Sequence, residues 1–300
     1  MDITIIVIEG FERWLVAMGY AESTAQGSVN YVRDFYLWLK VSSDVEISQI
    51  DGKVIRAYYG HLQKRKRKRG SGSLSDNYIN SNINALKRFS RYLQESGKGN
   101  LEIDVQRRSI TTKPRIILSQ EEIHAMYRVC GKVSEVHSKL LGIRDRAILG
   151  VYYGCGLRRS EGIELNVTDV QLKEKMIHVR KGKNYRERYV PMTGQVADDL
   201  MEYILVAREH TLSFKHTRHE ALFLSMRVGR LCGNQLIGRV KMLAKVAGIE
   251  KEVGLHILRH SIATHLLQSG LSLEEVSQFL GHSSLESTQI YTHIAHESQS

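Results

Sequence analysis

The residue types best suited to chemistry gather in the last fifty positions of the 300-residue chain. His256 and Arg259 are three residues apart, a spacing that places both on one face of a helix. His282 follows a glycine, and Tyr291 comes nine residues later. Histidine can transfer a proton, arginine can bind anionic oxygens with two parallel hydrogen bonds, and tyrosine can act as a nucleophile. Together these side chains could bind and attack an anionic group.

The elements that must present these side chains are visible in the same segment. Apolar residues that supply a packed helix face surround His256 and Arg259: Leu255, Leu258, Ile262 and Leu266. Ser272 and Glu275 form a capping box, which opens a short helix that ends at Gly281. A glycine there can adopt the left-handed conformation, so the chain can turn sharply and present the next residue. Ser284 can cap one further helix, which carries the tyrosine.

Each of these features has a structural explanation of its own. A His-x-x-Arg pair on a helix is common, and a histidine after a helix-ending glycine is often a cap. Tyr291 is one of 14 tyrosines, and a late amphipathic helix usually buries its aromatic residue in the core. Only the combination of features points to function.

The combination resembles the tyrosine recombinase (lambda-type integrase) family. The matching stretches are Gly156-Leu-Arg-Arg-Ser-Glu161, His256-Ile-Leu-Arg-His-Ser-Ile-Ala-Thr-His-Leu-Leu, Leu280-Gly-His-Ser-Ser and Thr288-Gln-Ile-Tyr-Thr-His. The spacings also resemble the family's, with 23 residues from Arg259 to His282 and 9 from His282 to Tyr291. The resemblance covers essentially the whole second domain, and the first domain is similar to the family's core-binding domain in a Xer-like arrangement.

The resemblance implies six catalytic residues: Arg158, Lys183, His256, Arg259, His282 and Tyr291. The tyrosine would attack a DNA phosphodiester and form a 3′-phosphotyrosyl bond, which conserves the bond energy, so religation needs no ATP. The two guanidiniums would stabilise charge on the nonbridging oxygens. The lysine, on a mobile hairpin tip, would protonate the leaving 5′-oxygen. His256 would accept or shuttle a proton, and His282 would donate a hydrogen bond to the phosphate.

Two of the six assigned residues have another residue of the same type within two positions in the sequence. Lys181 lies two residues before Lys183, which we prefer because it directly follows a glycine and because of its distance from the later Arg-Tyr-Val-Pro stretch. Arg159 follows Arg158, but the Gly-Leu-Arg order favours the earlier arginine. Glu161 is expected to support the site without touching the substrate.

The charge of the chain indicates a polyanionic partner. Its 43 Lys+Arg against 32 Asp+Glu give a net charge of +11, which favours nucleic acid ahead of a membrane. Six consecutive cations cannot be buried, so we expect an exposed, mobile segment that either is merely solvated or contacts DNA phosphates. These candidate DNA contacts are Lys64, Arg65, Lys66, Arg67, Lys68 and Arg69.

We expect a mostly α fold with a small antiparallel sheet. Helical spacing predicts an N-terminal four-helix bundle, with two runs between Phe11 and about Lys40, then Val54–Lys64 and Ser75–Gln94. Ser23 and Thr24 are candidate caps between the first two runs, and Trp14 and Trp38 are expected in the core.

Loss of helical periodicity places a domain boundary after the bundle. Residues 1–105 are predicted to be a helical core-type DNA-binding domain, 106–118 a basic linker, and 119–300 a mixed α/β catalytic domain of the DNA breaking-rejoining type. Ser119 and the acidic residues after it resemble a helix N-terminus. Alternation predicts a hairpin of Met176–Arg180 and Arg186–Val190 with a cationic tip, and Ala221–Leu224 as a possible third strand.

Other patterns exclude several classes of protein. The three cysteines lie far apart, which favours a reducing interior. The N-terminal apolar run is too short for a membrane span and lacks the basic stretch of a signal peptide, so we expect a cytoplasmic protein with no membrane partner. No metal-binding motif or nucleotide-binding glycine loop is present in the sequence, so we expect no cofactor and no small-molecule partner.

The leading hypothesis is a site-specific recombinase for integration, excision, inversion or resolution, of the kind that mobile elements use. The resemblance implies double-stranded DNA as partner and a homo-tetramer on paired sites. Only nine residues follow Tyr291, which argues against docking of a C-terminal segment on a neighbouring subunit. Two alternatives are a type IB topoisomerase, which relaxes DNA without pairing two sites, and a non-catalytic DNA-binding protein on the same fold. Joining of strands from two duplexes distinguishes a recombinase from both.

Overall fold

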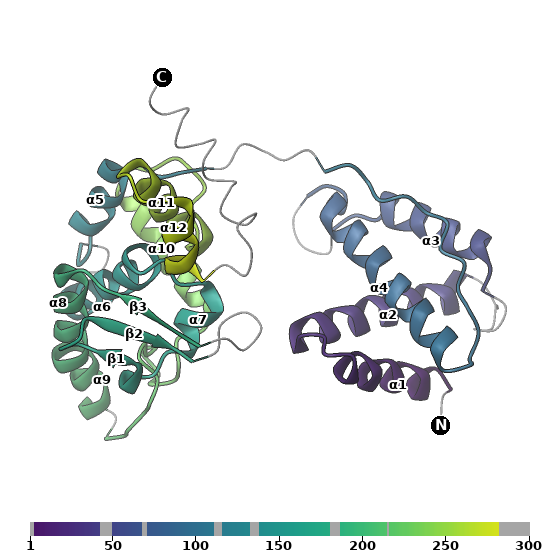
Figure 1. Cartoon of the computed structure of the whole chain (residues 1–300), viewed down its shortest axis with the longest axis horizontal. Helices are drawn as coiled ribbons and strands as arrows, with labels where there is room; N and C mark the ends of the chain where they lie inside the picture. Colours follow the sequence, from purple (N-terminus) through teal and green to yellow (C-terminus); the bar gives the residue numbers. More distant parts are fainter. Residues whose placement is uncertain are drawn as a thin grey trace. The chain divides into compact units, whose positions relative to one another are not determined.

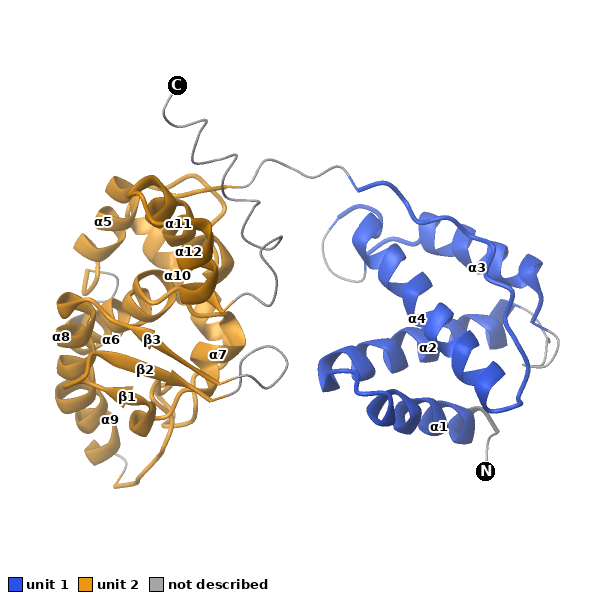
Figure 2. Cartoon of the chain, in the orientation of Figure 1, with its two compact units in different colours: residues 1–113 blue, residues 114–300 orange. Residues whose placement is uncertain are grey.

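The protein is described from a computed structural model of the whole chain. The structure describes residues 3–42, 50–67, 71–110, 116–132, 138–180, 187–214 and 216–281. The chain divides into two compact units, residues 1–113 and residues 114–300 (Figure 2). This division falls inside the range 106–118, in which the sequence predicts a linker. Each unit has a hydrophobic core of its own.

Four helices make up the described part of the first unit (Figure 1): α1 (Ile3–Ala17), α2 (Glu22–Ser42), α3 (Gly52–Lys64) and α4 (Asp76–Glu95). Asp51 and Ser75 cap α3 and α4, because their side chains accept hydrogen bonds from backbone N–H groups in the first turn. The predicted caps of α2 are wrong. The backbone carbonyl of Ala21 already accepts hydrogen bonds from Thr24 and Ala25, so the helix begins before Ser23.

Aromatic rings pack against one another within the core of the first unit. Phe11, Phe35 and Phe89 are fully buried. Trp14 and Trp38 pack against this core but stay partly exposed. The indole N–H of Trp14 donates to a carboxylate oxygen of Glu95 at 2.9 Å, because an indole N–H needs a partner even at the edge of a core.

The chain after α4 remains attached to the first unit. Leu101 is buried, and Ile103 and Val105 pack against the core. The side-chain amide of Asn80 pairs with the backbone of Arg108: its oxygen accepts from the N–H at 2.9 Å, and its Nδ2 donates to the carbonyl at 3.0 Å. The first residues of the predicted linker therefore lie on the helical bundle.

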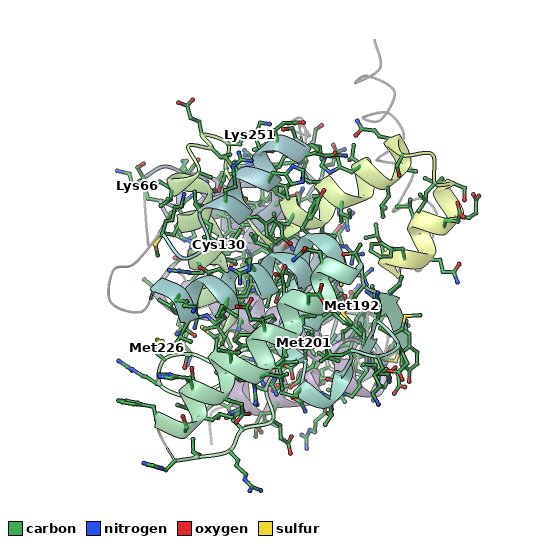
Figure 3. All side chains as sticks on the ribbon, turned by 90° about the vertical axis from the view of Figure 1, so that its left-hand side faces the viewer. Lys66, Cys130, Met192, Met201, Met226 and Lys251 are labelled. Atoms are coloured by element: carbon green, nitrogen blue, oxygen red, sulfur yellow. The ribbon has the colours of Figure 1, made fainter. Side chains whose placement is uncertain are left out.

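The second unit is also mainly helical (Figure 1). Its described helices are α5 (Gln120–Arg128), α6 (Ser138–Leu149), α7 (Arg159–Glu164), α8 (Gly194–Glu202), α9 (Glu209–Phe214), α10 (Gly233–Val246), α11 (Leu255–Gln268) and α12 (Leu273–Leu280). Short π-helical segments continue α6 and α8, at Gly150–Gly154 and Tyr203–Arg208. The predicted helix start at Ser119 is confirmed, and Ser119 and Glu122 form a capping box there. Lys251, labelled in Figure 3, donates to that glutamate at 2.7 Å and to the Ile117 carbonyl at 3.0 Å.

A small antiparallel sheet completes the second unit, in the order β1 (Val170–Gln171), β2 (Met176–Val179) and β3 (Arg188–Pro191). In the predicted hairpin, Ile177 pairs with Val190. The possible third strand at Ala221–Leu224 is wrong. Its side chains are all buried, and its ends form isolated bridges with Asn166 and Arg230, so it runs through the core instead of along a sheet edge.

The predicted fold class is confirmed: a mostly helical protein with one small antiparallel sheet. Among the described residues, no helix is both long enough and apolar enough to cross a bilayer.

Candidate active site

Three of the six predicted catalytic residues lie in the described part of the chain: Arg158, His256 and Arg259. Lys183, His282 and Tyr291 lie outside the described residues. The described part of the site combines the residue before α7, the start of α11, the end of α12 and the start of β3 (Figure 1).

The helices that carry the last predicted residues form for the expected local reasons. Leu255 and Leu258 bury one side of the first turn of α11. The side-chain oxygen of Ser272 accepts from the N–H of Glu275, and the glutamate accepts in return from the N–H of Ser272, so the predicted capping box of α12 is confirmed. Gly281 ends α12 in the left-handed conformation, with φ 64° and ψ 50°.

Arg259 is buried and reaches two backbone carbonyls. Its Nη1 donates to the carbonyl of Gly156 at 2.5 Å, and its Nη2 donates to the carbonyl of Leu280 at 2.8 Å. Leu280 is the last residue of α12, where carbonyls have no partner inside the helix and the helix dipole favours a cation. The arginine therefore stabilises the end of α12.

Arg158 holds the next carbonyl of the same helix end. Its Nη2 donates to the carbonyl of Gly281 at 2.8 Å, while its Nη1 donates to Glu161 at 2.8 Å. Leu157, directly before it, is fully buried and anchors the chain. Two guanidiniums thus bind two successive carbonyls, at the point where the chain continues to residue 282.

Gly156 allows this close approach between segments. Its φ of +58° is in the left-handed region, and a Cβ there would lie 2.9 Å from Leu280 Cδ2. A side chain at this position would separate the Gly156 carbonyl from Arg259.

His256 lies at the start of α11 and is exposed, whereas Arg259 is buried, so the two side chains differ in exposure despite the predicted shared face. Desolvation lowers the pKa of His256, and the positive charges of Arg259, Arg159 and Arg158 lower it further. A lowered pKa favours neutral imidazole near pH 7. In that state His256 can accept a proton.

Glu161 is the buried anion of the site. Its carboxylate accepts two hydrogen bonds from Arg158, one from the backbone N–H at 2.8 Å and one from the side chain at 2.8 Å. Burial raises the pKa of Glu161, but the hydrogen bonds and charge of Arg188, together with the hydrogen bonds of Arg158, outweigh it and lower the pKa to about 2. The carboxylate is therefore ionised throughout the working pH range.

Arg188, at the start of β3, is a site residue that the sequence analysis missed. It binds Glu161 with both terminal nitrogens at 2.9 Å. The alternation of the strand gave no reason to single it out. A buried carboxylate needs a cationic partner, but nothing in the sequence specified which arginine would supply it.

The described part of the basic run differs from the expected free loop. Lys64, Lys66 and Arg67 are exposed. Arg65 is half-buried and forms an ion pair with Asp34 at 2.6 Å, so it is a structural residue of the bundle. The backbone of Lys66 forms an isolated antiparallel β-bridge with the backbone of Ser73, between α3 and α4. Lys68 and Arg69 lie outside the described residues.

Comparisons with known proteins agree on one family. Residues 117–298 match the phage integrase family. The tyrosine recombinase XerD of Lacticaseibacillus casei is 32% identical over 289 residues, which cover 94% of this chain and 91% of that relative. The tyrosine recombinase XerC of Oceanobacillus iheyensis is 31% identical over 274 residues, covering 89% and 85%.

Solved structures show the same fold. The crystal structure of XerA recombinase matches 96% of this chain and 93% of its own, with 26% identity and a TM-score of 0.52. The XerH site-specific recombinase bound to its difH substrate, in a pre-cleavage complex, matches 93% of this chain and 78% of its own. Its TM-score is 0.69 at 22% identity, so this likeness concerns the fold.

Proposed function

This chain belongs to the phage integrase family, and we propose that it cleaves and rejoins double-stranded DNA at specific sites through a covalent bond to Tyr291. Its enzyme class is that of the tyrosine-type site-specific recombinases. We assign Arg158, His256, Arg259, His282 and Tyr291 to catalysis, and Lys183 to protonation of the leaving group.

The observation that carries the proposal is the convergence of two guanidiniums on the end of α12. Arg158 and Arg259 come from segments 101 residues apart, yet they bind the carbonyls of residues 281 and 280. His282 is the next residue of the chain. The arrangement supports an anion site beside which His282 begins the segment that leads to Tyr291.

The chemistry follows from the charges. When the tyrosine oxygen attacks a phosphodiester, negative charge grows on the nonbridging oxygens. Arginine stays protonated at any working pH, so two arginines can stabilise that charge in the transition state. Neutral His256 can accept a proton, and the cations around the site favour the phenolate form of the attacking tyrosine.

Trapping of the covalent intermediate tests the proposal. With a nicked duplex that prevents religation, the wild-type protein should form an adduct that survives denaturant, and Tyr291→Phe should form none while still binding DNA. Tyr189→Phe is the matched control, because Tyr189 is 55% exposed and should not affect adduct formation. An adduct in Tyr291→Phe would refute the assignment.

The other tyrosines near the site are poor nucleophiles. Tyr152 is fully buried, and its hydroxyl donates to the carbonyl of Arg159. Burial raises its pKa far above the usual range, which disfavours the phenolate. Tyr153 is half-buried, and burial raises the pKa of its hydroxyl, which likewise disfavours the phenolate. The raised pKa values of both tyrosines support Tyr291 as the nucleophile.

Recombination differs from DNA relaxation in its product. We propose that the active assembly is a homo-tetramer on two paired sites and that it acts in the cytoplasm. Two duplexes with different labels should yield joined strands, and light scattering of the complex should give the mass of four chains and two duplexes. Relaxation of a plasmid without strand exchange would favour a topoisomerase instead.

A further inference from the structure

We propose that Arg188 is a positioning residue that neutralises Glu161, so that the charge of Arg158 remains available to the scissile phosphate. This inference rests on the proposed function, in which Arg158 contacts that phosphate. Arg188 acts through Glu161 and does not itself touch the substrate.

The hydrogen bonds of Glu161 show how the charges are shared. One carboxylate oxygen accepts from Nη1 of Arg158 at 2.8 Å and Nη1 of Arg188 at 2.9 Å. The other accepts from the backbone N–H of Arg158 at 2.8 Å and Nη2 of Arg188 at 2.9 Å. Four donors occupy the lone-pair positions that an ionised carboxylate offers. Arg188 therefore supplies half of the hydrogen bonds of this anion.

The side chains that share these bonds are strongly shielded from solvent. The exposed fractions are 1% for Glu161, 15% for Arg188 and 21% for Arg158. In such surroundings charges interact more strongly than in water. With Arg188 present, the three side chains carry a net charge of +1, because two arginines face one carboxylate. Without Arg188, Glu161 would cancel the charge of Arg158.

A second contact gives Arg188 a role in geometry. A Cβ on Gly281 would lie 2.6 Å from Nε of Arg188, so the guanidinium packs directly against this glycine. That Nε is buried and has no hydrogen-bond partner among the residues that the structure describes. Since the carbonyl of Gly281 is held by Arg158, the start of β3, the residue before α7 and the end of α12 are joined through two arginines.

The test removes the charge of Arg188 while keeping a hydrogen-bond donor. Arg188→Gln should bind DNA normally but form the covalent adduct on the order of tenfold to a hundredfold more slowly, by analogy with the loss of a side chain that orients a metal ligand. Arg188→Lys, which keeps the charge, should retain most of the rate. A methylphosphonate at the scissile position carries no negative charge, so it should reduce the defect of Arg188→Gln.

A compensating change separates neutralisation from a merely structural role. In the double variant Arg188→Gln with Glu161→Gln, the net charge near Arg158 returns to +1, so adduct formation should recover toward the rate of Glu161→Gln alone. A side chain that only held the fold would give a further loss in the double variant.

Arg239→Gln is the matched control. Arg239 binds Asp145 with two nitrogens at 2.6–2.9 Å, and the exposed fractions are 11% and 0%, so the ion pair resembles that of Arg188 and Glu161. The control should lose stability without a change in adduct formation by the folded protein.

Two results would overturn the inference: wild-type rates in Arg188→Gln, or a double variant much slower than Glu161→Gln. The second comparison remains decisive if Arg188→Gln alone does not fold, because the double variant contains no buried carboxylate that lacks a cation. If the wild-type protein forms no adduct, the proposed function fails. If it forms one and Arg188→Gln does so equally fast, only the role of Arg188 fails.

Discussion

At the scale of single residues, Arg158 binds protein and still has donors for a substrate. A guanidinium has five N–H donors in a planar fork. Arg158 uses Nη1 and Nη2 on Glu161 and Gly281, and each of these nitrogens carries two hydrogens. The contacts fix the orientation of the fork before DNA binds. Preorganisation of this kind reduces the reorganisation needed in the transition state.

Replacement of Arg259 by lysine tests this role. Arg259→Lys keeps the charge but loses the fork that reaches the carbonyls of Gly156 and Leu280. We expect DNA binding close to normal and cleavage on the order of a hundredfold slower, the scale of losing one preorganised donor.

The control for this variant is a second DNA substrate, in which an uncharged methylphosphonate replaces the scissile phosphate. A neutral methylphosphonate needs less positive charge, so it should restore much of the cleavage in a variant that lacks one of the two arginines. Equal defects on charged and neutral substrates would mean that Arg259 serves only the fold.

The pH dependence of cleavage should report on His256. The pKa of His256 lies below its usual 6.5, so the neutral base is lost only as the pH falls through that lowered value. Arg159→Ala removes one of the charges that lower this pKa, so the pKa should rise and the acid limb of the rate profile should move to higher pH. Arg159→Lys keeps the charge and should leave the acid limb of the rate profile at the same pH. If Arg159→Ala also leaves the acid limb at the wild-type pH, His256 is excluded as the titrating base.

At the scale of elements, the end of α12 is the point after which the proposed catalytic residues His282 and Tyr291 follow in the sequence. Gly281→Ala introduces a Cβ that must displace Arg188, and Arg188 can move only by breaking its bonds to Glu161. We expect a loss of about 1–2 kcal/mol of stability from the left-handed conformation, together with slower adduct formation. Unfolding in urea and adduct trapping measure the two effects.

Gly270→Ala is the matched control for that prediction. Gly270 follows α11 with φ +96°, and a Cβ there would meet no atom within 4 Å. It should lower stability by a similar amount and leave adduct formation unchanged. If both alanines slow cleavage equally, backbone strain alone explains the loss, and the contact with Arg188 has no part in it.

At the scale of the whole molecule, the surplus of positive charge should make DNA binding strongly salt-dependent. Lys66 is exposed, so Lys66→Gln should lower the slope of log affinity against log salt by roughly 0.9 if it contacts a phosphate. Arg65→Gln should change the slope less and destabilise the bundle by on the order of 1 kcal/mol, because it breaks the pair with Asp34.

Binding isotherms at several salt concentrations and thermal unfolding measure these effects. A larger change in slope for Arg65→Gln than for Lys66→Gln would contradict the structural role of Arg65. An unchanged slope after replacement of Lys64 through Arg69 by neutral residues would show that the run is merely solvated.

Features that depend on neighbours in the sequence were predictable from the sequence itself. The helix start at Ser119, the capping box at Ser272, the left-handed Gly281 and the pairing of β2 with β3 all appear in the structure as predicted. Each of them depends on residues within one or two turns, where side-chain chemistry and backbone conformation are directly linked.

Contacts between distant segments were decided only by the tertiary structure. Arg188 meets Glu161 across 27 residues, Arg158 meets the carbonyl of Gly281 across 123, and Arg65 meets Asp34 across 31. No periodic pattern specifies these partners, because they depend on which faces the packed elements turn toward one another. The sequence therefore indicated which side chains are candidates for the chemistry, and packing determined which side chains contact them.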